Sequence, residues 1–377
     1  MKETSIYIHI PFCDHKCIYC DFYSITRHDD AIPFQKALLK EISNYAQKYS
    51  KGRIIKSIFF GGGTPSLMEP DYIKQILDEI RERYCVAEDA EITLETNPGT
   101  VNEDKINSFY KAGINRLSIG IQSFDEKDLK FLTRIHNRET AIDTVKQAYN
   151  SGFENISIDL IFNLPNQTKE KFLRNLNEAI NLPIKHISAY SLILEQGTLL
   201  NKMVLDGKVK IADEDYDAEI YEETIRFLDG HGFKQYEVSN FAKPGYESIH
   251  NKAYWHYHDY ISFGPSAHSF VDGKRWWNRK SLRAYIKDIN KSGEAIVGEE
   301  LPNKTEMFDE YVMLALRSNG IDVKDFEFRF GSEWLCKNYA EFKNLESKNL
   351  LSLSGDRICL TSKGYAVCDE LIMNLLK

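Results

Sequence analysis

Six short apolar runs alternate with amphipathic stretches in the first half of the chain, and this alternation constrains the fold most strongly. Because strands that alternate with helices favour a parallel sheet with helices packed outside it, we predict an α/β fold. Six such units would form an open, partial (β/α)6 barrel, a shortened version of the (β/α)8 barrel. The apolar runs cover 5–10, 55–60, 91–96, 116–120, 155–160 and 186–192. The helical patterns between them cover 33–49, 71–84, 102–112, 138–151 and 169–180.

Changes in this pattern divide the chain into three segments. Residues 1–210 hold the barrel units, and residues 211–300 extend the barrel with an acidic helix and a segment rich in aromatic residues and histidines. Within the extension we expect 236–270 to be irregular. Residues 301–377 combine helical stretches with a short hairpin around a Ser-Gly-Asp turn. This last combination predicts a smaller, helical C-terminal domain that resembles a winged helix.

Composition excludes several classes of protein. The chain has 377 residues, of which 42% are hydrophobic, and it carries a formal net charge of −8. A wide basic face for nucleic acid is therefore not expected, and residues 301–377 are not markedly basic either. No apolar run is long enough to span a membrane, and the N-terminus lacks the pattern of a signal peptide. We expect a cytoplasmic protein.

Three cysteines stand close together directly after the first predicted strand. Cys13, Cys17 and Cys20 have the spacing C-x3-C-x2-C. Thiolates are the preferred ligands of iron–sulfur clusters, so three of them can hold three irons of a 4Fe–4S cluster. The fourth iron would be free to chelate S-adenosylmethionine (SAM). The alternative is a zinc site completed by His15 or a distant ligand, but such sites usually pair two short knuckles and no second knuckle exists.

Further polar and glycine residues stand at the carboxyl ends of the other predicted strands. Gly61-Gly-Gly-Thr-Pro65 follows the second strand, Glu95 closes the third, Gln122 follows the fourth and Asp159 ends the fifth. Since the carboxyl ends of parallel strands meet at one edge of a sheet, we expect these features to converge. Each of them alone would be interpreted as a turn or a cap.

Together these motifs resemble those of the radical SAM superfamily, and in particular of its oxygen-independent coproporphyrinogen III oxidase family. The resemblance runs over nearly the whole chain and rests on Tyr7–Cys13, the cysteine loop, the glycine loop, Glu95–Pro98 and Gly120–Phe124. It implies a 4Fe–4S cluster on the three cysteines and a SAM pocket around them. The residues that it assigns to SAM are Tyr7, Gly62, Gly63, Thr64, Glu95, Gln122, Arg134 and Asp159.

Two features favour a branch of this family that consists of heme chaperones. The oxidases carry a fourth cysteine two residues after the third, where this chain has Phe22. The sequence His250-Asn-Lys-Ala-Tyr-Trp255 resembles the H-N-x-x-Y-W motif of the chaperone branch. Imidazole is a common axial ligand of heme iron, and His250 is the best candidate in this segment. The alternative is a buried aromatic cluster with hydrogen-bonded histidines.

The sequence therefore leaves three hypotheses. The first is a heme chaperone that binds the cluster, SAM and heme and passes heme to an acceptor protein, including a respiratory one. It is compatible with a homodimer and with peripheral contact with a membrane. The second is a coproporphyrinogen III oxidase of porphyrin biosynthesis, which would decarboxylate two propionate side chains. The third, a nucleic-acid-binding regulator that uses residues 301–377, is disfavoured by their charge.

Overall fold

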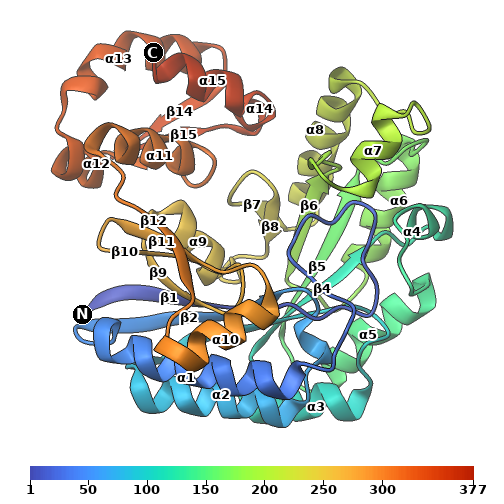
Figure 1. Cartoon of the computed structure of the whole chain (residues 1–377). Helices are drawn as coiled ribbons and strands as arrows, with labels where there is room; N and C mark the ends of the chain where they lie inside the picture. Colours follow the sequence, from blue (N-terminus) through green and yellow to red (C-terminus); the bar gives the residue numbers. More distant parts are fainter.

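The computed structural model describes residues 1–377 and has six parallel strands at its centre. They lie in chain order in the sheet, and each is joined to its neighbours by parallel pairing. Helices cover the outer face of this sheet (Figure 1). The strands are β1 (Lys2–Ile10), β2 (Arg53–Gly62), β3 (Val86–Thr96), β4 (Arg116–Gln122), β5 (Asn155–Phe162) and β6 (His186–Ser191). The helices are α1 (Ala31–Tyr49), α2 (Pro70–Arg83), α3 (Glu103–Ala112), α5 (Arg138–Asn150) and α6 (Lys169–Ile180). The predicted partial (β/α)6 barrel is confirmed.

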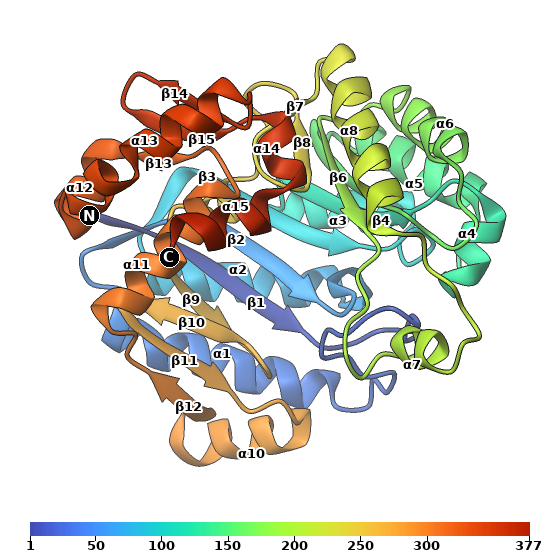
Figure 2. The ribbon, with the colours of Figure 1, turned by 90° about the horizontal axis from the view of Figure 1, so that it is seen from above.

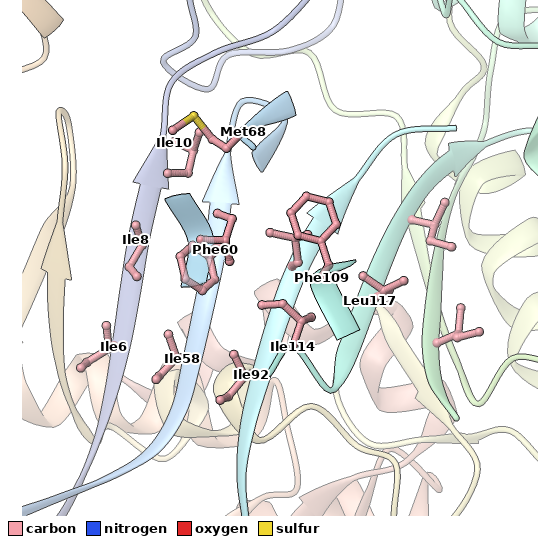
Figure 3. Close-up of a cluster of buried hydrophobic side chains, with 14 of the residues drawn as sticks. Ile6, Ile8, Ile10, Ile58, Phe60, Met68, Ile92, Phe109, Ile114 and Leu117 are labelled. Carbon is pink, nitrogen blue, oxygen red and sulfur yellow. The ribbon is translucent and has the colours of Figure 1, made fainter. Parts of the chain in front are cut away.

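Alternation along the strands separates the core from the interior of the barrel. Ile6, Ile8 and Ile10 of β1 are fully buried, and they lie beside the side chains of β2 and Phe109 of α3 in one apolar layer (Figure 3). Successive side chains of a strand point to opposite faces. Tyr7 and the neighbouring residues of the same parity therefore face the inside of the barrel. Because the helices pack on the outer face of the sheet, its inner face can carry polar groups.

Short strands extend the sheet at both edges, so that it contains twelve strands. β9 (Asp259–Phe263) pairs with β1 in parallel, and β10 (His268–Val271), β11 (Lys274–Asn278) and β12 (Ile296–Glu300) continue from it with antiparallel pairing. At the other edge β8 (Asn240–Ala242) and β7 (Lys234–Gln235) follow β6. The prediction that 236–270 is irregular was wrong, because its strands are too short to show alternation. This segment also contains α9 (Ile249–Trp255).

The C-terminal segment forms a small domain whose hydrophobic core also includes Tyr257 and Phe270 of the barrel extension. Its three strands are arranged in the order β13-β15-β14, and helices α11, α12 and α13 pack against them. This arrangement confirms the helical, winged-helix-like prediction. Its elements are α11 (Lys304–Leu316), β13 (Ile321–Asp322), α12 (Val323–Phe330), α13 (Glu333–Ser347), β14 (Leu351–Ser354), β15 (Arg357–Leu360), α14 (Ser362–Ala366) and α15 (Cys368–Leu375).

The remaining helices lie at the rim of the barrel and on its edge. They are η1 (Pro65–Leu67), α4 (Glu126–Phe131), α7 (Leu199–Leu205), α8 (Glu214–Gly230) and α10 (Leu282–Ser292). The N-terminus lies beside the small domain, whereas the loop after β1 lies away from it (Figures 1 and 2). None of the helices is both long and apolar enough to cross a lipid bilayer.

Candidate functional site

A cavity of about 280 Å³ opens at the carboxyl ends of β1 to β5. Eleven of the twelve site residues predicted from the sequence line it, namely Tyr7, Cys13, Cys17, Cys20, Gly62, Gly63, Thr64, Glu95, Gln122, Arg134 and Asp159. His250 does not. The convergence expected from the strand ends is therefore present in the structure.

The cysteine loop is closed at its base by pairing between residues that precede and follow it. The Cys13 amide donates to Ile25 (N···O 2.9 Å), and the Ile25 amide donates to Pro11 (2.7 Å). No disulfide joins the three thiols. No three His, Cys, Asp or Glu side chains of the chain approach one another closely enough to hold a single metal ion. All three thiols line the cavity, and three thiolates in one loop can each bind a separate iron of a 4Fe–4S cluster.

Gly62 and Gly63 are required by close approach of the backbone to β1. Gly62 has a φ of 110°, and a Cβ atom there would lie 2.5 Å from the His9 ring. A Cβ on Gly63 would lie 2.5 Å from the carbonyl oxygen of Phe12. The Gly63 amide donates to Ile10 (2.7 Å), and the Thr64 amide donates to Phe12 (2.7 Å). The glycine loop is thus bound to the chain that leads into the cysteine loop.

Two carboxyl groups, those of Glu95 and Asp159, line the cavity together with the cysteines. Glu95 accepts a hydrogen bond from the Gly62 amide (3.2 Å), and Asp159 accepts one from Ser118 (3.5 Å). Burial, and then the nearby Asp159, raises the pKa of Glu95 to about 8. Burial also raises the pKa of Asp159. A cationic group placed between them would favour both charged forms, because an opposite charge offsets desolvation.

Arg134 connects the cysteine loop with the strand ends. Its guanidinium donates to Asn97 Oδ1 (2.6 Å), to the Gly120 carbonyl (2.5 Å) and to Cys17 Sγ (3.6 Å). Gln122 ends β4 with a φ of 70°, a conformation rarely adopted by residues other than glycine. Such local strain is typical of functional sites.

His250 is buried against β2 and does not line the cavity. Its ring is 2% exposed and stacks on Phe59, with 4.9 Å between the centroids. Nδ1 bonds to Ser57 Oγ (2.9 Å) and Nε2 to Tyr254 Oη (3.1 Å). Burial, and then the positive charge of Arg116, lowers the pKa of His250 to about 3. Both ring nitrogens of His250 are thus used in hydrogen bonds within the protein, and its role as a heme ligand stays a prediction. The sequence alternative, a hydrogen-bonded aromatic cluster, describes its surroundings.

Some residues of the cavity were not among the predicted site residues. Asn97 bonds both Arg134 and Thr64 Oγ1 (2.9 Å) and so joins two walls of the cavity. It stands in the Glu95-Thr-Asn-Pro motif, which could have indicated it. Ser118 and Tyr19 also line the cavity, and no motif marks either of them.

Comparison with known families gives two matches. Residues 7–179 match the Radical SAM superfamily, and residues 303–367 match the HemN C-terminal domain. Among solved structures, the chain is similar to the coproporphyrinogen III oxidase (HemN) from Escherichia coli, described as a radical SAM enzyme. The TM-score is 0.83 with 24% identity, covering 99% of this chain and 90% of that chain. This likeness supports the fold.

Relatives at higher identity match from about three quarters of this chain to its full length. The heme chaperone HemW of Bacillus subtilis (strain 168) is 34% identical, covering 97% of each chain. That of Escherichia coli (strain K12) is 42% identical over 73% of this chain and 72% of its own. Radical S-adenosyl methionine domain-containing protein 1, mitochondrial, of Bos taurus is 32% identical over 100% of this chain and 88% of its own. This chain therefore belongs to the radical SAM superfamily and, within its coproporphyrinogen III oxidase-like family, to the HemW branch.

Proposed function

We propose that this protein is a heme chaperone that binds a 4Fe–4S cluster, SAM and heme, and transfers heme to an acceptor protein. The observation that carries this proposal is the full-length similarity to relatives that are named heme chaperones. The cavity supports the cofactor part, because it gathers the three thiols and the eight residues expected to contact SAM. We assign cluster and SAM to residues 1–210, the H-N-x-x-Y-W segment to 211–300 and a partner-binding domain to 301–377.

The residues of the cavity match the chemical groups of SAM. Glu95 would accept hydrogen bonds from the ammonium group, and Arg134 would neutralise the carboxylate. Asp159 would accept from ribose hydroxyls, and Tyr7 offers an apolar ring face. When bound, the cluster and SAM supply one-electron chemistry at the sulfonium, which belongs to the cofactors and not to the protein.

The second candidate function is that of a coproporphyrinogen III oxidase. The similarity of fold to the solved oxidase favours it. Phe22 argues against it, because this side chain lines the cavity at the position where the oxidases have a fourth cysteine. Phe22 is 62% exposed.

Anaerobic reconstitution followed by two parallel assays tests both functions. The reconstituted protein should show the visible absorbance of a sulfide-bridged iron cluster, and Cys17→Ala should abolish it. The exposed Cys336, which lies outside the cavity, provides the control variant Cys336→Ala. Titration with hemin should shift the Soret band. Without that shift the chaperone proposal fails, and formation of protoporphyrinogen from coproporphyrinogen would establish the oxidase instead.

A further inference from the structure

A second hollow lies between the barrel and the C-terminal domain, at the amino ends of β1 and β9. It consists of two adjoining cavities of about 370 and 520 Å³ that share Tyr257, Met307 and Arg329. Both volumes lie in the range of small-molecule sites. We call this hollow the interdomain groove. Its chemically relevant lining residues are Tyr257, His258, Met307, Phe308, Arg329 and Phe330.

His258 is the one histidine of the H-N-x-x-Y-W region whose ring is free. His250, His256 and His268 each use at least one ring nitrogen in a hydrogen bond within the protein. His258 forms no such bond, and its nearest aromatic neighbour is the His256 ring, 5.6 Å away between centroids. Burial, above all, lowers the pKa of His258, so that the ring is neutral at pH 7. Neutral imidazole is the form that binds iron.

The conformation at the end of α9 directs His258 into the groove. Tyr257 has a φ of 57°, and the His258 amide returns to the Ala253 carbonyl (2.9 Å), which ends the helix. The Tyr257 hydroxyl donates to Glu310 (2.6 Å) of the C-terminal domain. A left-handed conformation of a bulky residue is held by its surroundings. The H-N-x-x-Y-W segment therefore positions Tyr257 and His258, which follow shortly after α9.

The walls of the larger cavity are aromatic and aliphatic, whereas the smaller cavity, which His258 lines, also carries several charged side chains. Phe308 and Phe330 meet edge to face, with 5.5 Å between their ring centroids, and Met307 lines both cavities. Flat apolar faces of this kind suit a porphyrin ring. Methionine sulfur is an axial heme ligand in some proteins, so Met307 offers a second coordinating atom.

Some of the charged side chains that line the groove form ion pairs, and others do not. Lys304 lines the larger cavity and forms no ion pair, whereas Arg329 is bonded to Asp325 (2.9 and 3.0 Å). The acidic groups of the smaller cavity are Glu3, Asp259 and Asp272. Lys2 and Arg53 neutralise the two aspartates, whereas Glu3 forms no ion pair. An anionic group is thus best placed near Lys304. Heme carries two propionates that would meet this requirement.

We propose that the interdomain groove is the heme site, with His258 as the axial ligand and Lys304 facing the propionates. This inference rests on the proposed function of heme binding and names the site. It also separates heme from the cysteine loop by the length of β1. The nine residues of β1 span roughly 25–30 Å at about 3.3 Å per residue.

Hemin titration of the full-length chain tests the axial ligand. His258→Ala should raise the dissociation constant by about tenfold or more and move the Soret band, and added imidazole should restore the band. His268→Ala is the matched control, because this exposed histidine lies outside the groove. If the wild type binds no hemin, the proposed function fails. If the wild type binds and His258→Ala binds equally well with the same spectrum, the groove proposal fails.

A second variant tests the groove even if His258→Ala were misfolded. Lys304→Glu should weaken binding of hemin by about tenfold but leave binding of hemin dimethyl ester unchanged, because the ester lacks anionic propionates. Lys291→Glu on α10 is the control, since this exposed lysine lies outside the lining of the groove. If Lys304→Glu and Lys291→Glu bind hemin with equal affinity, the assignment of the propionates is overturned. If only His268→Ala loses affinity for hemin, heme binds outside the groove.

Discussion

At the residue scale, the cavity contains a carboxyl group, Glu95, whose charged form is unfavourable until a cationic ligand is bound. Glu95 is enclosed by protein beside a second carboxyl group, Asp159, and its pKa is raised to about 8 from an ordinary value of 4.5. Between these two values the folded protein holds a proton that the unfolded chain releases. The stability of the SAM-free protein therefore falls as the pH rises from about 4.5 to 8.

Glu95→Gln should stabilise the protein without SAM at pH 8, by roughly 1–3 kcal/mol, since water in the cavity screens part of the effect. The gain should shrink as the pH is lowered towards 4.5, and urea denaturation at pH 8 and 5.5 measures it. The same variant should bind SAM at least about tenfold more weakly, because the charged acceptor is lost. A gain equal at both pH values, or equal to that of exposed Glu333→Gln, would contradict this account.

Gly62→Ala should abolish SAM binding and lower the melting temperature, because its Cβ would overlap the His9 ring at a φ of 110°. Gly230→Ala is the matched control. Gly230 lies at the end of α8, and a Cβ atom added there would have nothing within 4 Å, so this change should be neutral or slightly stabilising. Differential scanning fluorimetry and equilibrium dialysis with SAM check both. Unimpaired SAM binding by Gly62→Ala would show that the loop is not constrained as described.

At the scale of elements, α9 depends on a carboxylate from a distant strand. Glu91 of β3 accepts hydrogen bonds from the amides of Ile249 and His250 (3.1 Å each), at the amino end of α9. It also lies 3.8 Å from the buried guanidinium of Arg116. One side chain therefore caps the helix and balances a buried cation.

Glu91→Ala should cost about 3–5 kcal/mol of unfolding free energy, because it leaves a buried cation and free helix amides. Asp213→Ala, which removes the cap of the exposed start of α8, should cost only about 1 kcal/mol. Urea unfolding followed by circular dichroism compares the two. Equal losses would show that Glu91 is not needed for α9.

The barrel could be predicted from the sequence because its strands are long and apolar on at least one face. β9 could not, because it begins with buried Asp259, whose charge is matched by Arg53, 206 residues away. The cysteine loop and the glycine loop were found because local motifs mark them. The hydrogen-bonded surroundings of His250 could not be predicted from a local motif, because one of its partners, Ser57, is 193 residues away in the sequence. Long-range partners of buried polar groups leave no local pattern.

At the scale of the whole molecule, the proposed SAM and heme sites lie at opposite ends of β1. Cys17→Ala should therefore remove the cluster and leave the affinity for hemin within about twofold of the wild type. Hemin titration of both proteins under anaerobic conditions measures this. A tenfold loss of hemin affinity in Cys17→Ala would show that the two sites are energetically coupled.

The apolar walls of the interdomain groove all belong to one hydrophobic core, which joins Tyr257 and Phe270 of the barrel extension to the C-terminal domain. An occupant of the groove therefore adds contacts beside a core that already connects the two parts of the molecule. Conversely, a partner that pulls the C-terminal domain away from the barrel weakens the binding of the occupant by the same free energy by which the occupant opposes that movement. Release of the occupant in this way also exposes the apolar surface of the shared core, and the binding of the partner has to offset that cost.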